Sequence, residues 1–320
     1  MSFAGSPDRV EARLVPEAGY EFDAFRSSGL PRRAGVALVR AAATAAVAPA
    51  ACLRILRRRR PDVVLGAGGY VSGPMVLAAA LERTPAALLE ADAHLGLANR
   101  LAAPFAKRVF LAAPIPGHDG AKFRLTGRPV PQRSLTGPAA EARAGFDLPA
   151  EGPVLLVLGG SQGALRLNEL AVEQWGAGGP AVLHLCGERD YEALRDRVSR
   201  PDYRLLPFTD EIGAAYGAAD LAVARAGGSV WELAAAGLPA VLVPYPHATA
   251  DHQTKNARQL EAAGGAVVVP ESELERVPSL VEELLADEPR REHMRRAMLD
   301  VARPGAAAEI AEELVALASA

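Results

Sequence analysis

The sequence predicts an α/β protein made of two doubly wound, Rossmann-like domains that face a cleft. Short apolar runs of strand length alternate with helical segments along the chain, which is typical of parallel sheets. A proline-rich stretch at residues 129–149 interrupts this alternation once, and glycine turns follow several of the apolar runs. Ligands in such folds bind beyond the carboxyl ends of the strands, so we expect these turns to line the cleft.

In the first half, the expected strands are residues 2–5, 62–66, 86–90 and 108–111. Helices are expected over residues 8–15, 33–60 and 95–106, and from the end of the segment 67–74 to about Leu81. The long alanine-rich region 33–60 contains Pro49, where we expect a bend or a break. It ends in Arg57-Arg-Arg-Arg60, cations that complement the carboxyl end of a helix.

In the second half, the expected strands are residues 154–158, 181–185, 203–205, 221–224, 240–243 and 266–269, with helices between them. The segment 129–149 reads as a linker that carries one short helix at 139–144. We therefore expect domains at residues 1–133 and 134–305, with a terminal helix at 306–320 that packs back on the first domain.

Composition excludes several classes of protein. The 320 residues carry a formal net charge of -3, which gives no electrostatic case for binding nucleic acid. Cys52 and Cys186, the two cysteines, lie in apolar runs and are expected to be buried thiols in a reducing cytoplasm. No signal peptide is visible at Met1. The segment 36–56 contains two arginines and a proline, which argues against a transmembrane helix.

The strand at 154–158 runs into Gly159-Gly-Ser-Gln-Gly163, and a helix is expected from Ala164. A glycine turn at a helix N-terminus presents free backbone N–H groups and a positive dipole end, which favour a phosphate. An ordinary strand-to-helix turn also needs glycine for close packing, and the pattern matches neither the dinucleotide fingerprint nor the Walker loop. Both readings remain open from this turn alone.

A second turn, Arg225-Ala-Gly-Gly-Ser229, repeats this arrangement, with Glu232 three residues beyond Ser229. Ser229 and Glu232 form the pattern of a capping box, but a carboxylate here also suits a ribose diol. The loop from His247 to Asn256 is dense in side chains that hydrogen-bond sugar hydroxyls. Together these features predict a site for a diphosphate linked to a sugar.

Several motifs in fixed order resemble the MurG family of peptidoglycan glycosyltransferases, in glycosyltransferase family 28. In the second half they are Gly159–Gly163 with Asn168, Pro207-Phe208 with Asp210, Arg225–Gly227, Glu232–Pro239, His247 and Asp251–Asn256. In the first half they are residues 11–19, 61–66, 68–74 and 96–100. The resemblance covers nearly the whole chain.

The resemblance implies an inverting enzyme that transfers N-acetylglucosamine from its UDP donor to a lipid-linked muramoyl-pentapeptide, at the cytoplasmic face of the cell membrane. No cofactor or metal is implied, and no Asp-x-Asp pair occurs. Ser161 would contact the diphosphate, Glu232 the ribose and Gln253 the sugar. The full donor set implied is Ser161, Gln162, Gly163, Thr209, Arg225, Gly227, Gly228, Ser229, Glu232, Gln253 and Asn256. The acceptor-side set is Tyr70, Ser72, Asp92 and Asn99.

The chain departs from the family pattern mainly in the acceptor half. The His-Glu-Gln-Asn signature is Leu89-Glu-Ala-Asp92, and Pro131 stands where an arginine is expected, with Arg128 displaced from that position. Residues 225–232 are one residue shorter than usual, and Thr209 replaces an isoleucine at the uracil contact. The family's first strand and Gly-Gly-Thr-Gly-Gly-His loop would precede Met1. We hypothesise that Met1 is a misassigned start; a chain that truly lacks this loop should have poor stability and weak or no transfer activity.

Two alternatives follow from these departures: a related UDP-sugar transferase with another lipid or small-molecule acceptor, and a truncated non-catalytic UDP-sugar-binding protein. The general base is unknown, and Glu90 and His94 are candidates by their place in the chain. For the membrane, Arg54 and residues 57–60 are either a lipid contact or the solvated end of a core-facing helix.

Overall fold

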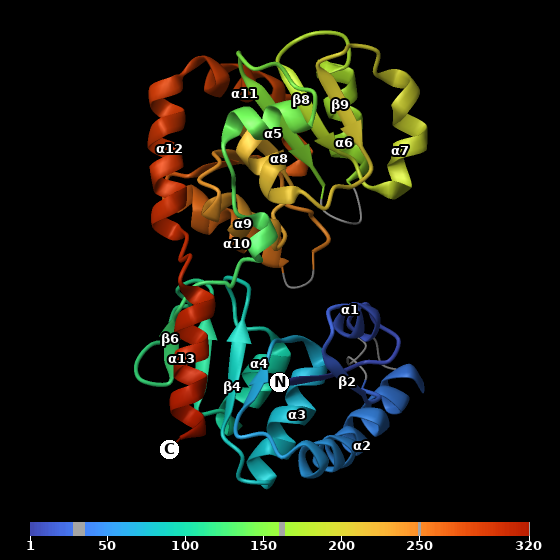
Figure 1. Ribbon diagram of the computed structural model, residues 1–320, viewed down its shortest axis with the longest axis vertical. Coiled ribbons are helices and arrows are strands. Elements are labelled where there is room, and N and C mark those ends of the chain that lie inside the picture. The colour runs from blue at the N-terminus through green and yellow to red at the C-terminus, as the bar shows by residue number, and fades with distance from the viewer. Residues whose placement is uncertain (28–35, 160–163, 249–250, 320) are drawn as a thin grey trace. The chain divides into compact units, whose positions relative to one another are not determined.

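The computed structural model describes residues 1–27, 36–159, 164–248 and 251–319, with only the backbone of residues 36–46 (Figure 1). The chain forms two compact units, residues 1–127 with 307–320, and residues 128–306. Sequence reasoning expected boundaries at 133 and 305. The difference arises because residues 128–138, expected to divide between the domains, belong to the second unit.

In the first unit, the structure contains β1 (Ser2–Gly5), α1 (Glu11–Glu17), β2 (Glu21–Ala24), α2 (Val36–Arg59), β3 (Val64–Gly66), α3 (Gly69–Leu81), β4 (Ala86–Glu90), α4 (Leu97–Ala102), η1 (Ala103–Phe105), β5 (Arg108–Leu111), β6 (Phe123–Leu125) and α13 (Ala306–Ala318). Pro49 lies inside α2, which continues through it as one helix, so the expected break does not occur. No helix among the described residues is long and apolar enough to cross a membrane.

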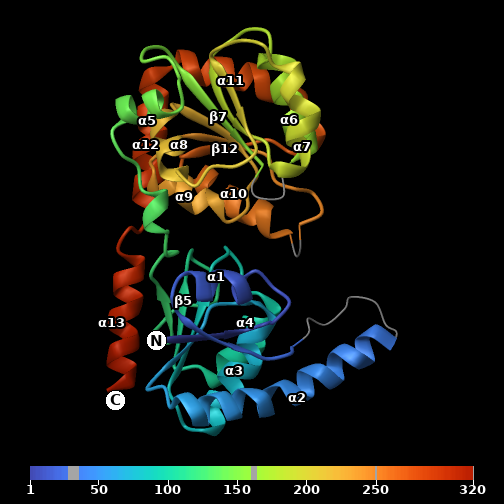
Figure 2. The ribbon, with the colours of Figure 1, turned by 45° about the vertical axis from the view of Figure 1, so that its right-hand side comes forward.

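The strands of the first unit form two parallel sheets, β1-β2 and β3-β4-β5-β6. Among the described strands, β1 pairs with β2 alone and β3 with β4 alone, so one edge of each is open. Alternate residues of β4 and β5 point to opposite faces of the sheet. Leu88 and Val109 enter a core with α3, whereas Ala87 and Phe110 meet Ile310 of α13. Helix α13 therefore covers one face of this sheet (Figure 2).

The arginines at the end of α2 are paired within the first unit. Arg58 and Arg59 both bond the buried carboxylate of Asp23 on β2, and Arg57 reaches Glu82 at 2.9 Å. The hydrogen bond from Arg59 lowers the pKa of Asp23. These cations brace α2 against β2 and α3, which favours a structural role over a lipid contact.

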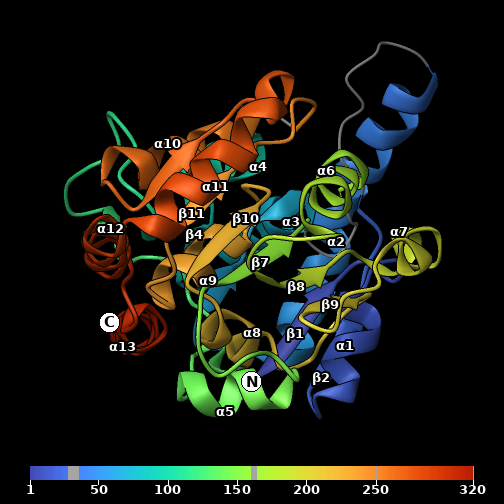
Figure 3. The ribbon, with the colours of Figure 1, turned by 90° about the horizontal axis from the view of Figure 1, so that it is seen from above.

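The second unit contains η2 (Gln132–Ser134), α5 (Ala139–Gly145), β7 (Val154–Leu158), α6 (Leu165–Trp175), β8 (Ala181–Leu185), α7 (Glu188–Leu194), η3 (Arg195–Arg197), β9 (Tyr203–Leu206), α8 (Ile212–Ala218), β10 (Leu221–Ala224), α9 (Ser229–Ala235), β11 (Ala240–Leu242), α10 (His252–Ala262), β12 (Ala266–Val268), η5 (Glu271–Arg276), α11 (Val277–Ala286) and α12 (Glu288–Val301). One parallel sheet has the order β12-β11-β10-β7-β8-β9. Helices cover both of its faces, α6 and α11 on one side and α8 with α5 on the other (Figure 3).

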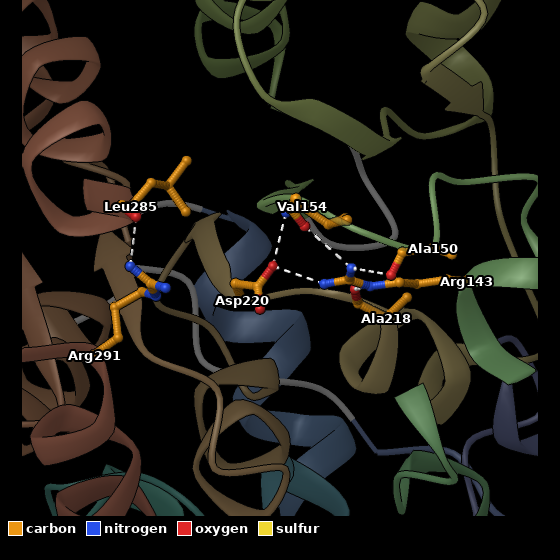
Figure 4. Close-up of polar contacts among 8 residues, drawn as sticks. Arg143, Ala150, Val154, Ala218, Asp220, Leu285 and Arg291 are labelled. Carbon is orange, nitrogen blue, oxygen red and sulfur yellow. Dashed lines mark hydrogen bonds and ion pairs between the residues drawn. The ribbon is translucent and has the colours of Figure 1, made fainter. Parts of the chain in front are cut away.

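Arg143 of α5 fastens the start of the second unit to the amino end of this sheet (Figure 4). Its guanidinium donates to the carbonyls of Ala150 and Ala218, both at 3.1 Å, and to Asp220 Oδ2 at 2.9 Å. The same Asp220 oxygen accepts the backbone N–H of Val154 at 2.8 Å. Polar contacts thus close the amino-terminal ends of the strands. The carboxyl ends of the strands are left open for a site.

Candidate functional site

A cavity of about 870 Å³ in the second unit opens at the carboxyl ends of its strands. Its lining follows β7, β8, β10, β11 and β12, as expected for a doubly wound sheet. The residues that line it are Arg128, Gly159, Ala164, Leu165, Arg166, Arg189, Arg225, Gly227, Gly228, Ser229, Glu232, Tyr245, His247, Gln253 and Glu271. We call this cavity the strand-end pocket.

Positive charge dominates the strand-end pocket. Four arginines line it against two glutamates. Such an excess of cationic side chains in a concave site favours an anionic ligand. No group of three or more acidic, histidine or cysteine side chains suited to a metal ion occurs in the described ranges.

Arg225, predicted as a donor residue, is buried at the end of β10 and braces the pocket. It forms an ion pair with Glu271 and donates to the carbonyls of Val243 at 3.2 Å and Pro244 at 3.4 Å. Its guanidinium also lies 5.6 Å from the ring centre of Tyr245. These contacts tie the ends of β10 and β11 to η5, because one guanidinium satisfies groups from all three.

Glu232 lines the pocket from α9, and of its two readings from sequence the capping box does not form. Helix α9 begins at Ser229 with Gly228 as its N-cap, and no side chain caps it. Instead, the carboxylate of Glu232 accepts the hydroxyl of Tyr216 at 2.9 Å. Burial and the neighbouring carboxylate raise the pKa of Tyr216, so its phenol stays protonated and donates. Tyr216 therefore fixes one side of the carboxylate and leaves the other toward the pocket.

Gln253 reaches the pocket from the first turn of α10. Its Oε1 accepts the backbone N–H of Tyr245 at 2.9 Å, which holds the side chain against the β11 loop. The ring of His247 meets Tyr245 edge-on at 5.5 Å between centroids. Gln253, His247 and Tyr245 thus form the polar end of the pocket beyond β11.

Three predicted donor residues, Ser161, Gln162 and Gly163, lie outside the described residues. Thr209 and Asn256 do not line the strand-end pocket. Thr209 Oγ1 accepts the backbone N–H of Glu211 at 3.1 Å just before α8, and Asn256 is fully buried in α10. The structure thus brings together Arg225, Gly227, Gly228, Ser229, Glu232 and Gln253 from the predicted donor set.

Arg128 is a pocket residue that sequence reasoning set aside as displaced. Its guanidinium packs on Gly228, where a Cβ would stand 2.7 Å from Nη2. A side chain at 228 would therefore force the Arg128 guanidinium to move away. Arg166, Arg189 and Glu271 were also missed, because nothing local marks them apart from other charged residues on helical segments.

The acceptor-side candidates belong to the first unit, where Glu90 organises the loop after β4. Glu90 Oε1 accepts the N–H of Asp92 at 3.2 Å, while Oε2 accepts the N–H of Gly96 at 2.8 Å and Asn99 Nδ2 at 2.9 Å. Both oxygens are thus engaged in shaping residues 91–99. His94 lies half-buried in the same loop.

Tyr70 and Ser72 lie in the first turn of α3. The Tyr70 hydroxyl accepts from Arg9 Nε at 3.3 Å, and Ser72 donates to the carbonyl of Gly68 at 2.5 Å. Ser72 is buried, so its hydroxyl serves the turn before α3.

Two Rossmann-like units, the second with an arginine-rich pocket at its strand ends, give the GT-B type of fold. The calicheamicin glycosyltransferase CalG4 shares this fold, with a TM-score of 0.70 at 20% identity over 98% of this chain and 90% of that one. The chain belongs to glycosyltransferase family 28. The C-terminal domain of that family matches residues 154–313, and the N-terminal domain matches residues 2–111.

Relatives within the family match over nearly the full chain. The UDP-N-acetylglucosamine--N-acetylmuramyl-(pentapeptide) pyrophosphoryl-undecaprenol N-acetylglucosamine transferase of Salinibacter ruber is 40% identical, over 99% of this chain and 88% of its own length. The enzyme of the same name from Nitrosococcus oceani is 41% identical, over 98% and 90%. The crystal structure of Acinetobacter baumannii MurG has a TM-score of 0.78 at 28% identity, over 98% of this chain and 90% of that one.

Proposed function

We propose that this chain transfers N-acetylglucosamine from UDP-N-acetylglucosamine to a lipid-linked muramoyl-pentapeptide in peptidoglycan synthesis. The observation that carries the proposal is the identity of about 40% with transferases of that name over nearly the whole chain. The strand-end pocket supports it, because its cations suit a diphosphate and its polar end suits a sugar.

In this proposal the donor lies along the carboxyl edge of the six-stranded sheet. Glu232 accepts hydrogen bonds from the ribose hydroxyls, and Gln253 binds the sugar. The diphosphate is held by Ser161 and by the turn at Gly227–Ser229. Arg128 also holds the diphosphate, because its guanidinium lies against Gly228. It supplies a cation there although Pro131 stands at the position where the family has an arginine.

The reaction is a single displacement, in which the acceptor hydroxyl attacks the anomeric carbon and UDP departs. Negative charge develops on the diphosphate as the bond to the sugar breaks. Cations that are already in place stabilise this charge without having to reorganise. Loop 91–99 belongs to the acceptor side. Both carboxylate oxygens of Glu90 accept hydrogen bonds that shape this loop, so His94 is the better of the two candidates for the general base.

Transfer to a defined acceptor tests the function. The full chain is incubated with labelled UDP-N-acetylglucosamine and lipid-linked muramoyl-pentapeptide, and labelled lipid is measured. Labelled product is the expected result. Donor binding without transfer would favour a non-catalytic UDP-sugar-binding protein, and product with other acceptors alone would favour a related transferase.

We also propose that the chain attaches peripherally to the membrane through an apolar stripe on α4 and η1. Leu97, Leu101 and Phe105 recur every fourth residue and are 54%, 61% and 48% exposed. Arg100 and Lys107 are exposed near the stripe and suit anionic lipid headgroups. Since Arg57, Arg58 and Arg59 are paired to carboxylates, this stripe is the better candidate for the lipid contact.

Replacing all three apolar side chains of the stripe by serine should weaken binding to phosphatidylglycerol vesicles by at least about tenfold, because their burial in lipid is lost. Cosedimentation measures the bound fraction. The matched control replaces the exposed Val10 and Leu14 of the same unit by serine and should bind as the parent does. Equal binding by the stripe variant and the control would rule out this surface.

A further inference from the structure

A chain of buried polar side chains runs through the core of the second unit to the strand-end pocket. His184 of β8 contacts the Tyr203 hydroxyl at 2.8 Å through Nδ1 and Asn168 Oδ1 at 3.0 Å through Nε2. Asn168 Nδ2 donates to the Cys186 carbonyl and to Asp190 Oδ2, both at 2.9 Å. His184 and Asn168 have no solvent exposure. A polar network in an apolar core is costly unless every member is satisfied.

The direction of each hydrogen bond in this chain follows by elimination. Asn168 donates from its amide nitrogen to two acceptors, so its Oδ1 must accept from His184. His184 Nε2 therefore carries the proton, and Nδ1 accepts from the Tyr203 hydroxyl. Burial lowers the pKa of His184 to about 3, so the imidazole remains neutral. The hydrogen bonds of this network therefore have only one set of directions. Through Asn168 the network also orients the carboxylate of Asp190.

Asp190 in turn orients Arg189, which lines the strand-end pocket. Arg189 Nε and Nη2 donate to the two Asp190 oxygens at 2.8 and 3.1 Å. The Asp190 side chain is 6% exposed, whereas that of Arg189 is 63% exposed. Among the described residues, none hydrogen-bonds Nη1 of Arg189. This nitrogen of the guanidinium group is therefore available to a ligand in the pocket.

We propose that Arg189 hydrogen-bonds the nucleotide half of the donor, and that Asp190 and Asn168 are positioning residues for it. This inference rests on the proposed donor. If the sugar lies at the polar end beyond β11, the nucleotide lies toward β7 and β8, where Arg189 follows β8. A side-on carboxylate holds the guanidinium in place before binding, so less side-chain entropy is lost when the ligand arrives. Lysine cannot reproduce this two-point contact.

Affinities for UDP, UMP and uridine, measured by calorimetry and competition, test the contact. Arg189→Ala should weaken UDP binding by about tenfold, as expected for a lost hydrogen bond to a charged group. Arg189→Lys should recover little of it. An equal loss for uridine assigns the contact to the nucleoside, and a loss for UDP and UMP alone assigns it to the phosphate. Unchanged affinity for all three overturns the proposal, provided that the parent chain binds UDP.

The matched control is Arg195→Ala, an exposed arginine close by that does not line the pocket and should leave all three affinities unchanged. Failure of the parent chain to bind UDP would count against the proposed function instead. The role of Asp190 is tested by a double-mutant cycle. Asp190→Asn should weaken UDP binding in the parent but not in the Arg189→Ala background. Equal losses in both backgrounds would show a general structural effect and contradict positioning.

Discussion

Glu232→Ala is expected to weaken binding of UDP-N-acetylglucosamine by about a hundredfold, because the two charge-assisted hydrogen bonds that we propose it makes to the ribose are lost. The carboxylate lines the strand-end pocket and is already oriented by the Tyr216 hydroxyl at 2.9 Å. Removing it leaves the buried Tyr216 phenol without its acceptor and, in the proposed complex, the ribose hydroxyls without theirs. Calorimetric titration of the donor measures the loss.

Two further substitutions separate ribose binding from support of the protein. Glu232→Gln keeps an acceptor for Tyr216 but removes the charge, so the affinity should fall by an intermediate factor. Tyr216→Phe keeps the carboxylate but frees it to rotate, and a loss of about fivefold is expected from one neutral hydrogen bond. If Glu232→Ala binds the donor as tightly as the parent, Glu232 does not hold the ribose.

Arg225→Ala is expected to destabilise the second unit by about 3–5 kcal/mol, since it removes the buried partner of Glu271 and leaves only the more distant, exposed Arg166 near that carboxylate. The side chains of this ion pair are 9% and 11% exposed. Both tryptophans, Trp175 and Trp231, belong to the second unit. Urea unfolding of the full chain, monitored by tryptophan fluorescence, therefore measures the stability of this unit.

Arg166 provides the matched control for Arg225. It pairs with the same Glu271 at 3.7 Å, but its side chain is 64% exposed. Exposed pairs contribute up to about 1 kcal/mol, so Arg166→Ala should change the unfolding free energy far less. Equal destabilisation by the two substitutions would contradict the bracing role of Arg225.

Strands buried on both faces could be predicted from sequence because their apolar runs are continuous. The expected bounds of β4, β5, β7, β8 and β10 agree with the structure. Two short strands were missed. The edge strand β2, Glu21–Ala24, alternates polar and apolar residues, and β6, Phe123–Leu125, has three residues with an arginine at its centre. Neither has the length or apolar content that marks a buried strand.

The candidate site shows the same division between local and tertiary information. Glycine turns and the placement of Glu232 and Gln253 follow from short motifs, so these residues could be expected in one pocket. The partner of Glu232 could not, because Tyr216 lies on α8, 16 residues earlier in the chain, and no local pattern links the two side chains. Arg128 was missed for a similar reason, since its fit against Gly228 depends on two segments about 100 residues apart.

Hydrogen exchange of the full chain with and without UDP-N-acetylglucosamine tests most directly whether the donor binds in the strand-end pocket. Binding there should slow exchange in peptides covering residues 225–232 and 245–253, which carry Glu232 and Gln253. Peptides from β1, β2 and α1 of the first unit serve as the internal reference and should exchange as before. Protection confined to the first unit, or no protection at a saturating donor concentration, would contradict the assignment of the donor to this pocket.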